Sequence, residues 1–535
     1  MLSKRWKACR RFLTAAPVRS VILVGLLAFG VSAFLSWLRP PLPRVHDEFS
    51  YLLAADTFAG GRLSRPTHPL WRYFETFHVL HEPSYASKYP PVQGLFLALG
   101  MRCTGAPIVG TWISVALGCA GVCWMLQGWT RPRWALLGGV FAALHHGIHG
   151  GISGWGTCYS WSQSYWGGGP AMLGGALVLG AYARWRRRAT LRAGLILGLG
   201  VAILANTRPF EGMLVCLPIL ATLLSRVLRS SRDTIAAAAA MSVLGVAGVL
   251  MAHHNVAVTG SASTLPYSRY EATYNPAPIF AAFHSPKPPP AYHHEVLKRF
   301  FVDWCTEQVQ RQKTLGGWWR YHRERMGWLK AFFVGPLILP LLVLAWTLRS
   351  RSNLVAFVLI TLVVGAHFFT VGIQPHYTAP VACCFFLLVV EGMRRLATIT
   401  IQGHRFGKLL NIQICLLVVL NLIMVGSALR SEVAGWEASR AAMQASLVAR
   451  GGKHVVVVSY KGEHNLLHEW VANRADIDGA EVVWAREMEE MRPLLRYFVD
   501  RSVWVVDADA EVPCLKVYRS LSPVTSSRKS RGASP

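Results

Sequence analysis

Asp47 and Glu48 form an adjacent pair of carboxylates shortly after the first long apolar run of the chain, Val21–Leu38. This uncharged run of 18 residues is just long enough to cross the hydrocarbon core of a bilayer. The basic residues before it are expected to stay in the cytoplasm, so the chain should emerge on the outer side. A carboxylate placed there could act as a general base whose pKa is set by partial burial.

A structural role for the pair is equally open at this point. Asp47 could be the N-cap of a helix that residues 49–55 suggest. The chain is poor in acids, however, with 27 Asp and Glu against 55 Lys and Arg. Two adjacent carboxylates at the outer surface of such a chain favour chemistry over solubility.

The composition indicates a polytopic α-helical membrane protein. Of the 535 residues, 53% are hydrophobic and 15% are charged, whereas a soluble protein carries roughly 25% charged residues. The formal net charge of +28 could indicate nucleic acid as a partner. The Lys and Arg residues lie in short clusters between apolar runs, however, as the positive-inside rule expects, so we predict no nucleic-acid binding.

Apolar runs and their flanking charges predict about 11 transmembrane helices. One stretch, residues 91–128, is interrupted near residues 100–103 and could be one broken span or a half-helix followed by a span. The predicted runs are Val21–Leu38, 91–128, Ala135–His149, Pro170–Tyr182, Leu191–Ala205, Phe210–Leu224, Thr234–Ala252, Leu329–Leu348, Leu354–Val371, Thr378–Val390 and Leu409–Ala428.

We expect a transmembrane domain over residues 1–430, with outer loops 39–90 and 254–328. A small extracytoplasmic α/β domain over 431–521 should follow, then a disordered tail over 522–535. Its predicted strands are His454–Tyr460, Glu481–Trp484 and Ser502–Val506, and its predicted helices are His464–Ala475 and Ala485–Tyr497, the latter kinked at Pro493.

Two basic residues at the outer mouths of spans could meet a phosphate. Lys88, followed by Tyr89 and two prolines, opens one span, and its alternative role is to snorkel to the lipid headgroups. Arg208 opens another, and with Glu211 it could form a structural i,i+3 ion pair or a phosphate-binding guanidinium held by a carboxylate.

Further polar residues are expected on the outer side. Tyr267 lies near the start of loop 254–328, and His376 and Tyr377 open a late span, where a lone His is more often a packed interfacial residue. The segment Gly154–Gly169 is rich in aromatic residues, which could form an interfacial belt or stack on a sugar or lipid. His145, His146 and His149 lack a nearby acid and give a weak metal signal.

These residues and their topology resemble the GT-C membrane glycosyltransferases, above all the protein-mannosyltransferase and lipid A aminoarabinose-transferase types. In those families an Asp-Glu pair opens the first large outer loop and a Lys-Pro-Pro-Leu stretch ends it. Here Asp47-Glu48 and Lys88-Tyr89-Pro90-Pro91 take these places, and Gln374–Tyr377 is similar to a late Arg-Tyr or His-Tyr element. The resemblance covers roughly residues 1–395.

The resemblance implies transfer of a sugar from a polyprenyl-phosphate carrier to a cell-envelope glycan, lipid or protein on the outer side of a bacterial inner membrane. Asp47 would deprotonate the acceptor hydroxyl, and Glu48 would orient the acceptor or the sugar. Lys88 and Arg208 would hold the leaving phosphate, whose developing charge a cation stabilises.

Two departures from the family pattern matter. The inserted Tyr89 changes the register of Lys88. The segment Gly154–Gly169 has no Asp or Glu, so it lacks the acidic metal-binding motif of oligosaccharyltransferase-type relatives. We therefore expect no metal and no cofactor beyond the lipid-linked donor substrate.

Two rival functions remain at this stage. A transporter or flippase for a lipid-linked substrate would also need polar outer sites, but its charged residues should line several spans at mid-depth. A non-catalytic envelope assembly protein would use the C-terminal domain to bind its partner. No internal repeat is visible, which disfavours the transporter.

Overall fold

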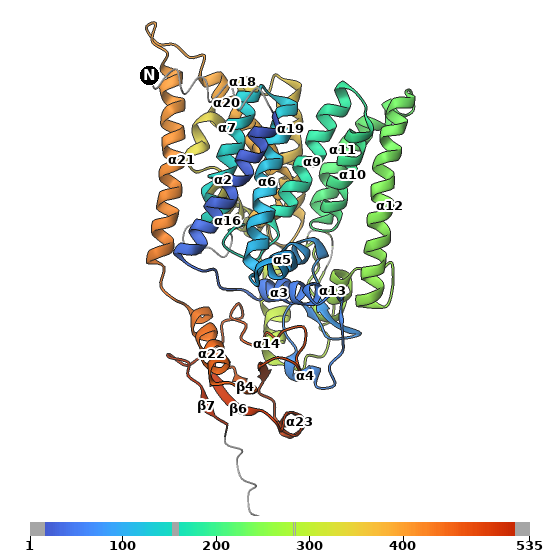
Figure 1. Cartoon of the computed structure of the whole chain (residues 1–535), viewed down its shortest axis with the longest axis vertical. Coiled ribbons are helices and arrows are strands. Elements are labelled where there is room, and N and C mark those ends of the chain that lie inside the picture. The colour runs from blue at the N-terminus through green and yellow to red at the C-terminus, as the bar shows by residue number, and fades with distance from the viewer. Residues whose placement is uncertain (1–16, 152–159, 282, 284, 519–535) are drawn as a thin grey trace, which may run out of the picture.

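The computed structural model describes residues 17–151, 160–281, 283 and 285–518. The basic N-terminal residues and the predicted tail 522–535 lie outside this range. The described chain forms a bundle of long helices, with shorter helices and two small sheets gathered at one end (Figure 1). Helix α2 starts at the far end of the bundle and runs toward them (Figure 1).

The bundle is built from apolar helices with small residues where they approach closely. A Cβ on Gly110, for example, would lie 1.9 Å from the carbonyl oxygen of Phe96. The long helices are α2 (Pro17–Leu38), α6 (Pro107–Trp129), α7 (Pro132–Ala143), α9 (Gly168–Arg187), α10 (Leu191–Ala205), α11 (Pro209–Val227), α12 (Ser231–Thr259), α19 (Arg351–Ala366), α20 (Ala382–Leu396) and α21 (Phe406–Ser431).

Among the described residues, six helices are long and apolar enough to cross a membrane, or seven if one bent pair counts as a single span. The expected count of about 11 is therefore not confirmed, because several apolar runs form shorter or broken helices. Residues 91–128 divide into α5 (Pro91–Thr104) and α6 at Gly105, whose φ of 77° ends the first helix. The run Leu329–Leu348 breaks where α16 (Leu315–Phe333) meets residues 335–342 at an angle of 93°.

Loop 39–90 folds into helices and an antiparallel sheet of order β1-β3-β2 at one end of the bundle. Its elements are α3 (His46–Ala59), β1 (Arg65–Pro66), α4 (Trp71–Phe74), β2 (Val79–Leu80) and β3 (Ser84–Ser87). The prolines after β3 open α5, where the missing N–H at a first helical turn carries no cost. The residues just before these prolines are thereby placed beside α3, which packs against α5.

Loop 254–328 contributes short helices on the same side. They are α13 (Pro266–Tyr274), α14 (Glu295–Lys298), a π-helical turn (Arg299–Trp304) and α15 (Cys305–Gln310). The remaining short elements are α8 (His146–Gly150), a 3-10 turn (Gly335–Leu337), α17 (Ile338–Leu342), α18 (Leu344–Thr347) and 3-10 turns at His367–Phe369, Pro375–Tyr377 and Ala379–Val381.

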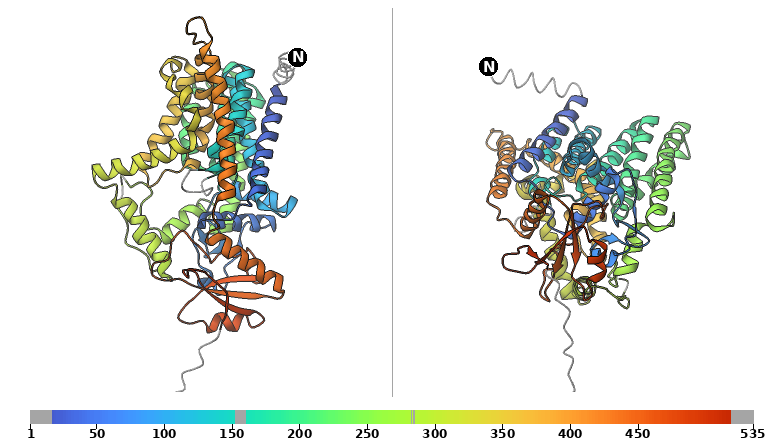
Figure 2. Two further views of the ribbon diagram at one scale, coloured as in Figure 1. Left: turned by 90° about the vertical axis from the view of Figure 1, so that its left-hand side faces the viewer. Right: turned by 60° about the horizontal axis from the view of Figure 1, so that its bottom comes forward.

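The C-terminal region holds a four-stranded sheet of order β5-β4-β6-β7, in which β4 is parallel to β5 and β6 while β7 is antiparallel (Figure 2). The three predicted strands are confirmed. The elements are α22 (Trp436–Arg450), β4 (His454–Ser459), β5 (Val482–Arg486), α23 (Arg492–Tyr497), β6 (Ser502–Asp507) and β7 (Lys516–Val517).

The two helices expected in this region were wrong in part. Residues 464–475 form turns, because side chains there bind the backbone locally: Glu469 accepts the N–H of Val471 at 2.7 Å. The second helix starts at Arg492, because β5 continues as far as Arg486. Pro493 lies in the first turn of that helix and does not kink it.

The C-terminal strands share a hydrophobic core with loop 39–90. Leu53, Phe74 and Tyr85 of that loop are buried in one cluster with Val455 and Val483 of the sheet. A second, sheet-internal cluster is built around Trp470 and Trp484 on the other side. The sheet is thus packed directly onto the outer loop that carries Asp47.

Candidate functional site

The acidic pair lies in the first turn of α3, and the two carboxylates have different surroundings. The helix begins at His46 with Val45 as the N-cap, so Asp47 is not the cap. Glu48 does the capping: its Oε2 accepts the backbone N–H groups of Arg44 and Val45 at 2.7 and 3.3 Å. Its Oε1 accepts the N–H of Tyr165 at 3.0 Å. Glu48 is 1% exposed and is held by backbone alone.

The pKa values of the two carboxyls are pushed apart. Burial raises the pKa of Glu48 to about 7, against the opposing effect of its backbone donors. Burial also acts to raise the pKa of Asp47, but His78, His46 and the Tyr89 hydroxyl outweigh it, and the pKa lies well below its ordinary value. Asp47 is therefore ionised at neutral pH, and its side chain keeps 23% of its surface exposed.

Lys88 and Tyr89 follow strand β3 and turn in different directions. The Lys88 ammonium lies 2.8 Å from Oε1 of Glu271 and is almost fully buried. The rings of Tyr267 and Tyr270 cover it at 4.8 and 4.6 Å from their centroids. The positive charge of Lys88 is thus already neutralised by Glu271, a residue that no sequence pattern singled out.

Tyr89, the residue inserted relative to the family pattern, reaches the acid instead. Its hydroxyl donates a hydrogen bond to Oδ1 of Asp47, and its ring stacks on that of Tyr51 with centroids 4.4 Å apart. Lys88 and Tyr89 are thus adjacent in the chain but bind two different carboxylates, Glu271 and Asp47.

Arg208 lies at the start of α11, with its guanidinium carbon 4.7 Å from the centroid of the Tyr377 ring. Neither a hydrogen bond nor an ion pair engages its guanidinium within residues 17–151, 160–281, 283 and 285–518. The alternative of an Arg208–Glu211 ion pair is not formed. Glu211 instead lies 3.4 Å from Nε2 of His367.

Asp47 and Arg208 act on the same two tyrosines. Burial raises the pKa of Tyr51 and of Tyr377 to about 12; the charge of Arg208 lowers both pKa values and the charge of Asp47 raises both. The charges of Asp47 and Arg208 thus both act on this aromatic pair, and the arrangement brings together three of the predicted site residues, namely Asp47, Arg208 and Tyr377.

His376 joins this group as a buried side chain. It is 2% exposed, and its ring meets Trp166 and Tyr377 at centroid distances of 4.3 and 4.8 Å. Burial, and then the charge of Arg208, lower its pKa well below the ordinary value. His376 is thus a neutral, packed imidazole near both charges.

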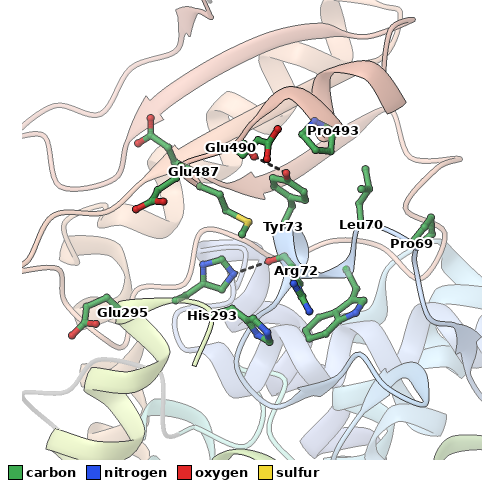
Figure 3. A pocket seen from close by; sticks show the side chains of 13 residues that line it. Pro69, Leu70, Arg72, Tyr73, His293, Glu295, Glu487, Glu490 and Pro493 are labelled. Carbon is green, nitrogen blue, oxygen red and sulfur yellow. Dashed lines mark hydrogen bonds between the residues drawn. The ribbon is translucent and has the colours of Figure 1, made fainter. Parts of the chain in front are cut away.

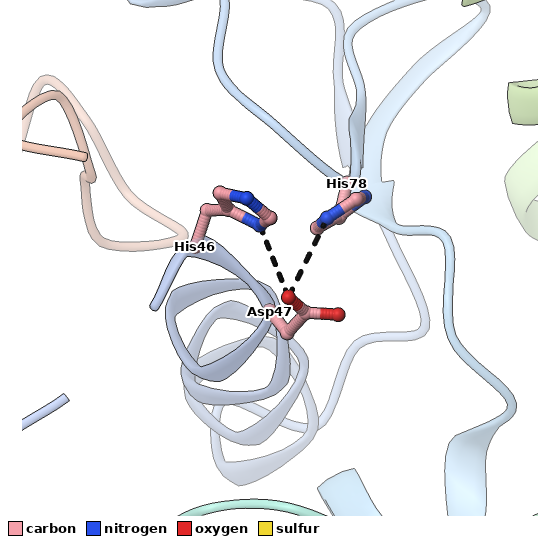
Figure 4. Close-up of side chains that lie close together, drawn as sticks. All are labelled: His46, Asp47 and His78. Carbon is pink, nitrogen blue, oxygen red and sulfur yellow. Dashed lines mark ion pairs between the residues drawn. The ribbon is translucent and has the colours of Figure 1, made fainter. Parts of the chain in front are cut away.

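Two histidines that sequence reasoning missed flank Asp47 (Figure 4). Nδ1 of His46 lies 3.0 Å, and Nε2 of His78 lies 3.6 Å, from Oδ2 of Asp47. His46 was visible as the neighbour of Asp47 in the sequence. His78 carried no signal, since its position depends on how β2 and β3 fold back against α3.

The backbone of His78 is held in a strained conformation. Its φ is 61°, a region that costs a non-glycine residue on the order of 1 kcal/mol. Its N–H donates to the hydroxyl of Tyr270 at 2.6 Å, and its carbonyl accepts the hydroxyl of Ser50 at 2.6 Å. Side chains of α13 and α3 thus hold the backbone of His78 in place.

His46, Asp47 and His78 are also the group that could hold a metal ion in the part of the chain that the structure describes. The other candidate histidines are used differently. His145 and His146 lie 3.0 Å from backbone carbonyls of Phe333 and Ala331. His149 contacts the carbonyl of Ala143 and the hydroxyl of Ser162.

The aromatic segment Gly154–Gly169 is described only from residue 160 onward. Trp161, Tyr165 and Trp166 are buried within the protein, so these three do not form an interfacial belt. Gly168 allows this packing, because a Cβ there would lie 2.3 Å from the ring of Trp161.

A separate cavity of about 810 Å³ opens farther out, between the two outer loops and the C-terminal sheet (Figure 3). Tyr73 donates to the carbonyl of Glu490 at 2.6 Å, and His294 lies 2.7 Å from the carbonyl of Arg72. The cavity is lined by Pro69, Leu70, Trp71, Arg72, Tyr73, His293, His294, Glu295, Glu487, Met488, Glu489, Glu490 and Pro493.

No protein-family model and no curated protein sequence matches this chain. Among solved structures, apo ArnT from Cupriavidus metallidurans is similar with a TM-score of 0.48 and 13% identity, over 91% of this chain and 92% of that one. The same protein bound to undecaprenyl phosphate gives 0.47 and 12%, over the same shares.

The apo oligosaccharyltransferase of Archaeoglobus fulgidus is similar with a TM-score of 0.46 and 10% identity, over 82% of this chain. This chain spans 62% of the length of that enzyme. ArnT and the oligosaccharyltransferase are both GT-C membrane glycosyltransferases, the class that the sequence resembles. Since the TM-scores lie below 0.5, the function is inferred below from the residues of this chain.

Proposed function

We propose that this protein is an integral membrane glycosyltransferase. It transfers a sugar from a polyprenyl-phosphate-linked donor to a cell-envelope glycan, lipid or protein on the outer side of a bacterial inner membrane. The substrate class comes from the sequence resemblance, and the roles of the residues come from the arrangement around Asp47. No cofactor beyond the lipid-linked donor takes part in these roles.

The observation that carries the proposal is the presence of an ionised carboxylate together with a cation that has no counter-ion among the described residues. Asp47 is ionised and partly exposed, and Arg208 lacks a carboxylate partner in the described part of the chain. The two charges act on the same tyrosines without forming an ion pair with each other. Opposite charges kept apart in this way leave space for a substrate whose own charges change during the reaction.

In the proposed step, a carboxylate oxygen of Asp47 takes the proton of the acceptor hydroxyl. The acceptor oxygen forms a bond to the anomeric carbon of the donor sugar, while the bond from that carbon to the phosphate oxygen breaks. The electron pair of that bond leaves with the polyprenyl phosphate, whose added negative charge Arg208 stabilises. A phosphate leaves without protonation, so a single base is enough, unlike the two carboxylates of glycoside hydrolysis.

The remaining predicted residues take supporting roles. Glu48 is a positioning residue, because backbone N–H groups occupy its carboxylate and fix the first turn of α3. Tyr89 orients Asp47 through its hydroxyl. Lys88 is bound to Glu271, so Arg208 is the better candidate for the phosphate. Tyr267 covers Lys88 and shapes the wall of the site.

His376 and Tyr377 complete the proposed donor side. Tyr377 supports the guanidinium of Arg208 with its ring, and His376 packs behind it against Trp166. The N-terminus is proposed to be cytoplasmic and the C-terminal region, residues 431–521, extracytoplasmic. Membrane lipids and the lipid-linked donor are the expected partners.

The substitution Asp47→Asn tests the proposal, because it removes the base and keeps the size of the side chain. We expect transfer of radiolabelled sugar from a lipid-linked donor pool in membranes to fall by about 10²–10⁴-fold, the range for a lost general base. The control is Asp303→Asn, an exposed acid on an outer helix. Wild-type transfer by a correctly inserted Asp47→Asn protein would refute the assignment.

A further inference from the structure

We infer that His46, Asp47 and His78 form a binding site for a divalent transition-metal cation of the zinc type. This site uses no residue of the acid-free segment 154–169, from which the absence of a metal was expected. It shares Asp47 with the proposed function but does not depend on transfer taking place.

The ligand atoms of His46, Asp47 and His78 are close enough together for one cation placed between them to contact all three. The imidazole nitrogens of His46 and His78 lie 3.0 and 3.6 Å from this oxygen, and the three ligand atoms lie within 4.8 Å of one another. Two atoms bound to one zinc ion at about 2.1 Å lie at most about 4.2 Å apart, so closing the site needs a shift of less than about 1 Å.

The histidines are buried without compensating hydrogen bonds. Nδ1 and Nε2 of His46 and Nδ1 of His78 have no hydrogen-bond partner among the described residues, although the two side chains are 4% and 7% exposed. A buried polar group without a partner costs about 1–3 kcal/mol. Nδ1 of His46 and Oδ2 of Asp47 lie 3.0 Å apart, a separation that two ligands of one cation can adopt.

The surrounding structure holds both rings in place. His46 packs between Phe77 and Phe300, with ring centroids 4.8 and 5.0 Å away. The backbone of His78 is fixed at positive φ by the hydroxyls of Tyr270 and Ser50. Such preorganisation is typical of ligands whose direction matters, since strain of this kind persists only where neighbours impose it.

The type of ligand selects the type of cation. Two imidazole nitrogens with one carboxylate oxygen suit zinc and its neighbours better than magnesium or calcium, which prefer oxygen ligands. Three protein ligands would leave a fourth position of a bound zinc ion open, and Asp47 keeps 23% of its side-chain surface exposed. An open position is characteristic of reactive rather than structural zinc sites.

The test uses the purified full-length protein, stripped by a chelator and titrated with zinc chloride in a calorimeter. We expect one zinc ion per chain. His46→Phe keeps the aromatic packing, and His78→Asn tolerates the positive φ. Because loss of an outer-shell contact already costs about 10–100-fold in affinity, each variant should bind at least about 100-fold more weakly.

The matched control is His81→Phe, which replaces another buried histidine of the same outer loop that lies outside the cluster. Equal zinc binding by the wild type and by both variants, or no binding by the wild type, would overturn the inference. Because a variant can fail to fold, X-ray absorption at the zinc edge of the wild-type complex gives a second test. Nitrogen and oxygen ligands including imidazole are expected, and a sulfur ligand would refute the site.

The titration and the transfer assay separate the two proposals. A wild type that binds no zinc but loses transfer on Asp47→Asn would remove the metal site and leave the glycosyltransferase. A wild type that binds zinc through these ligands but does not require Asp47 for transfer would support the metal site and remove the proposed role of Asp47 in transfer.

Discussion

Two clusters of buried charge lie outside the helical bundle, and they are built in opposite ways. In the C-terminal region, Glu469 and Arg486 form an ion pair at 2.6 Å with both side chains 2% exposed or less. The Glu469 carboxylate also accepts the hydroxyl of Tyr460 and the N–H of Val471. Around Asp47, by contrast, no ion pair with Arg208 forms among the described residues, although both charges act on the pKa values of Tyr51 and Tyr377.

The difference separates charges that hold the fold from charges that remain available. The Glu469–Arg486 pair also binds the carbonyl of Glu75 and so connects the C-terminal sheet to loop 39–90. The charges of Glu469 and Arg486 neutralise each other within the protein, as do those of Lys88 and Glu271. Some polar atoms of Asp47, Arg208 and His46 have no partner among the described residues. Buried polar atoms without partners are costly, and a bound ligand could supply the missing contacts.

The largest effect should come from breaking the structural cluster. Glu469→Gln leaves the buried guanidinium of Arg486 without its counter-charge, and loss of one partner of a buried pair costs about 3–5 kcal/mol. We expect a clearly lower midpoint of thermal unfolding in detergent, with unchanged transfer per folded molecule. The exposed pair partner Glu295→Gln is the control. An unchanged midpoint for Glu469→Gln would contradict the structural role.

Arg208→Ala should weaken use of the donor substrate, because it removes the cation proposed to bind the phosphate. Loss of a hydrogen bond to a charged phosphate costs about 1.5–3 kcal/mol, which corresponds to about 10–150-fold weaker donor use. The measurement is transfer as a function of donor concentration, with stability followed in parallel. Arg269→Ala, an exposed arginine on α13, serves as the control. Equal donor dependence in the two variants would take Arg208 out of the site.

Titration of the Glu48 carboxyl should make the free energy of unfolding depend on pH. Its pKa is about 7 in the folded protein and 4.5 without the protein environment, so the folded state binds more protons than the unfolded state between these values. Stability contributed by the protonated form is present below pH 4.5 and is lost as pH rises toward 7. We expect this pH-dependent change in stability, on the order of 3 kcal/mol, to be absent in Glu48→Gln.

Asp47 should show the opposite sign. Its folded pKa is depressed, so its contribution to stability is present above the unfolded pKa and is lost as the pH falls through the folded pKa. An unfolding titration of Glu48→Gln and Asp47→Asn from about pH 2 to pH 8 covers the pKa ranges of both carboxyls and compares the two variants directly. Identical slopes in the two variants would show that the two neighbouring carboxylates do not have separate environments.

The smallest effect is expected from the pair that is already neutralised. Replacing Lys88 and Glu271 together, by Met and Gln, removes both charges, and replacing a whole buried pair is often nearly neutral. We expect donor use to change by less than about threefold, since Arg208 is retained. A loss as large as that of Arg208→Ala would restore Lys88 to the phosphate site.

The sequence predicted those features that depend on local composition. Apolar runs located the long helices α2, α11, α12, α19 and α21, and β-branched runs located the strands of the C-terminal sheet. The count of about 11 spans is not confirmed, because an apolar run does not show where a helix breaks. The expected helix at 464–475 failed for a similar reason: bonds from Glu469 and Asn473 to the backbone outweigh helical periodicity.

The sequence by itself determined that a carboxylate pair, a lysine and an arginine occupy the mouths of apolar segments, since charge and hydropathy are local properties. Tertiary structure alone decided which of them remain free. The fold turns Lys88 to Glu271 and Tyr89 to Asp47, and it brings His78 beside Oδ2 of Asp47. These pairings join segments distant in the chain, and the physical reason is that close packing, not local pattern, sets which buried polar groups find partners.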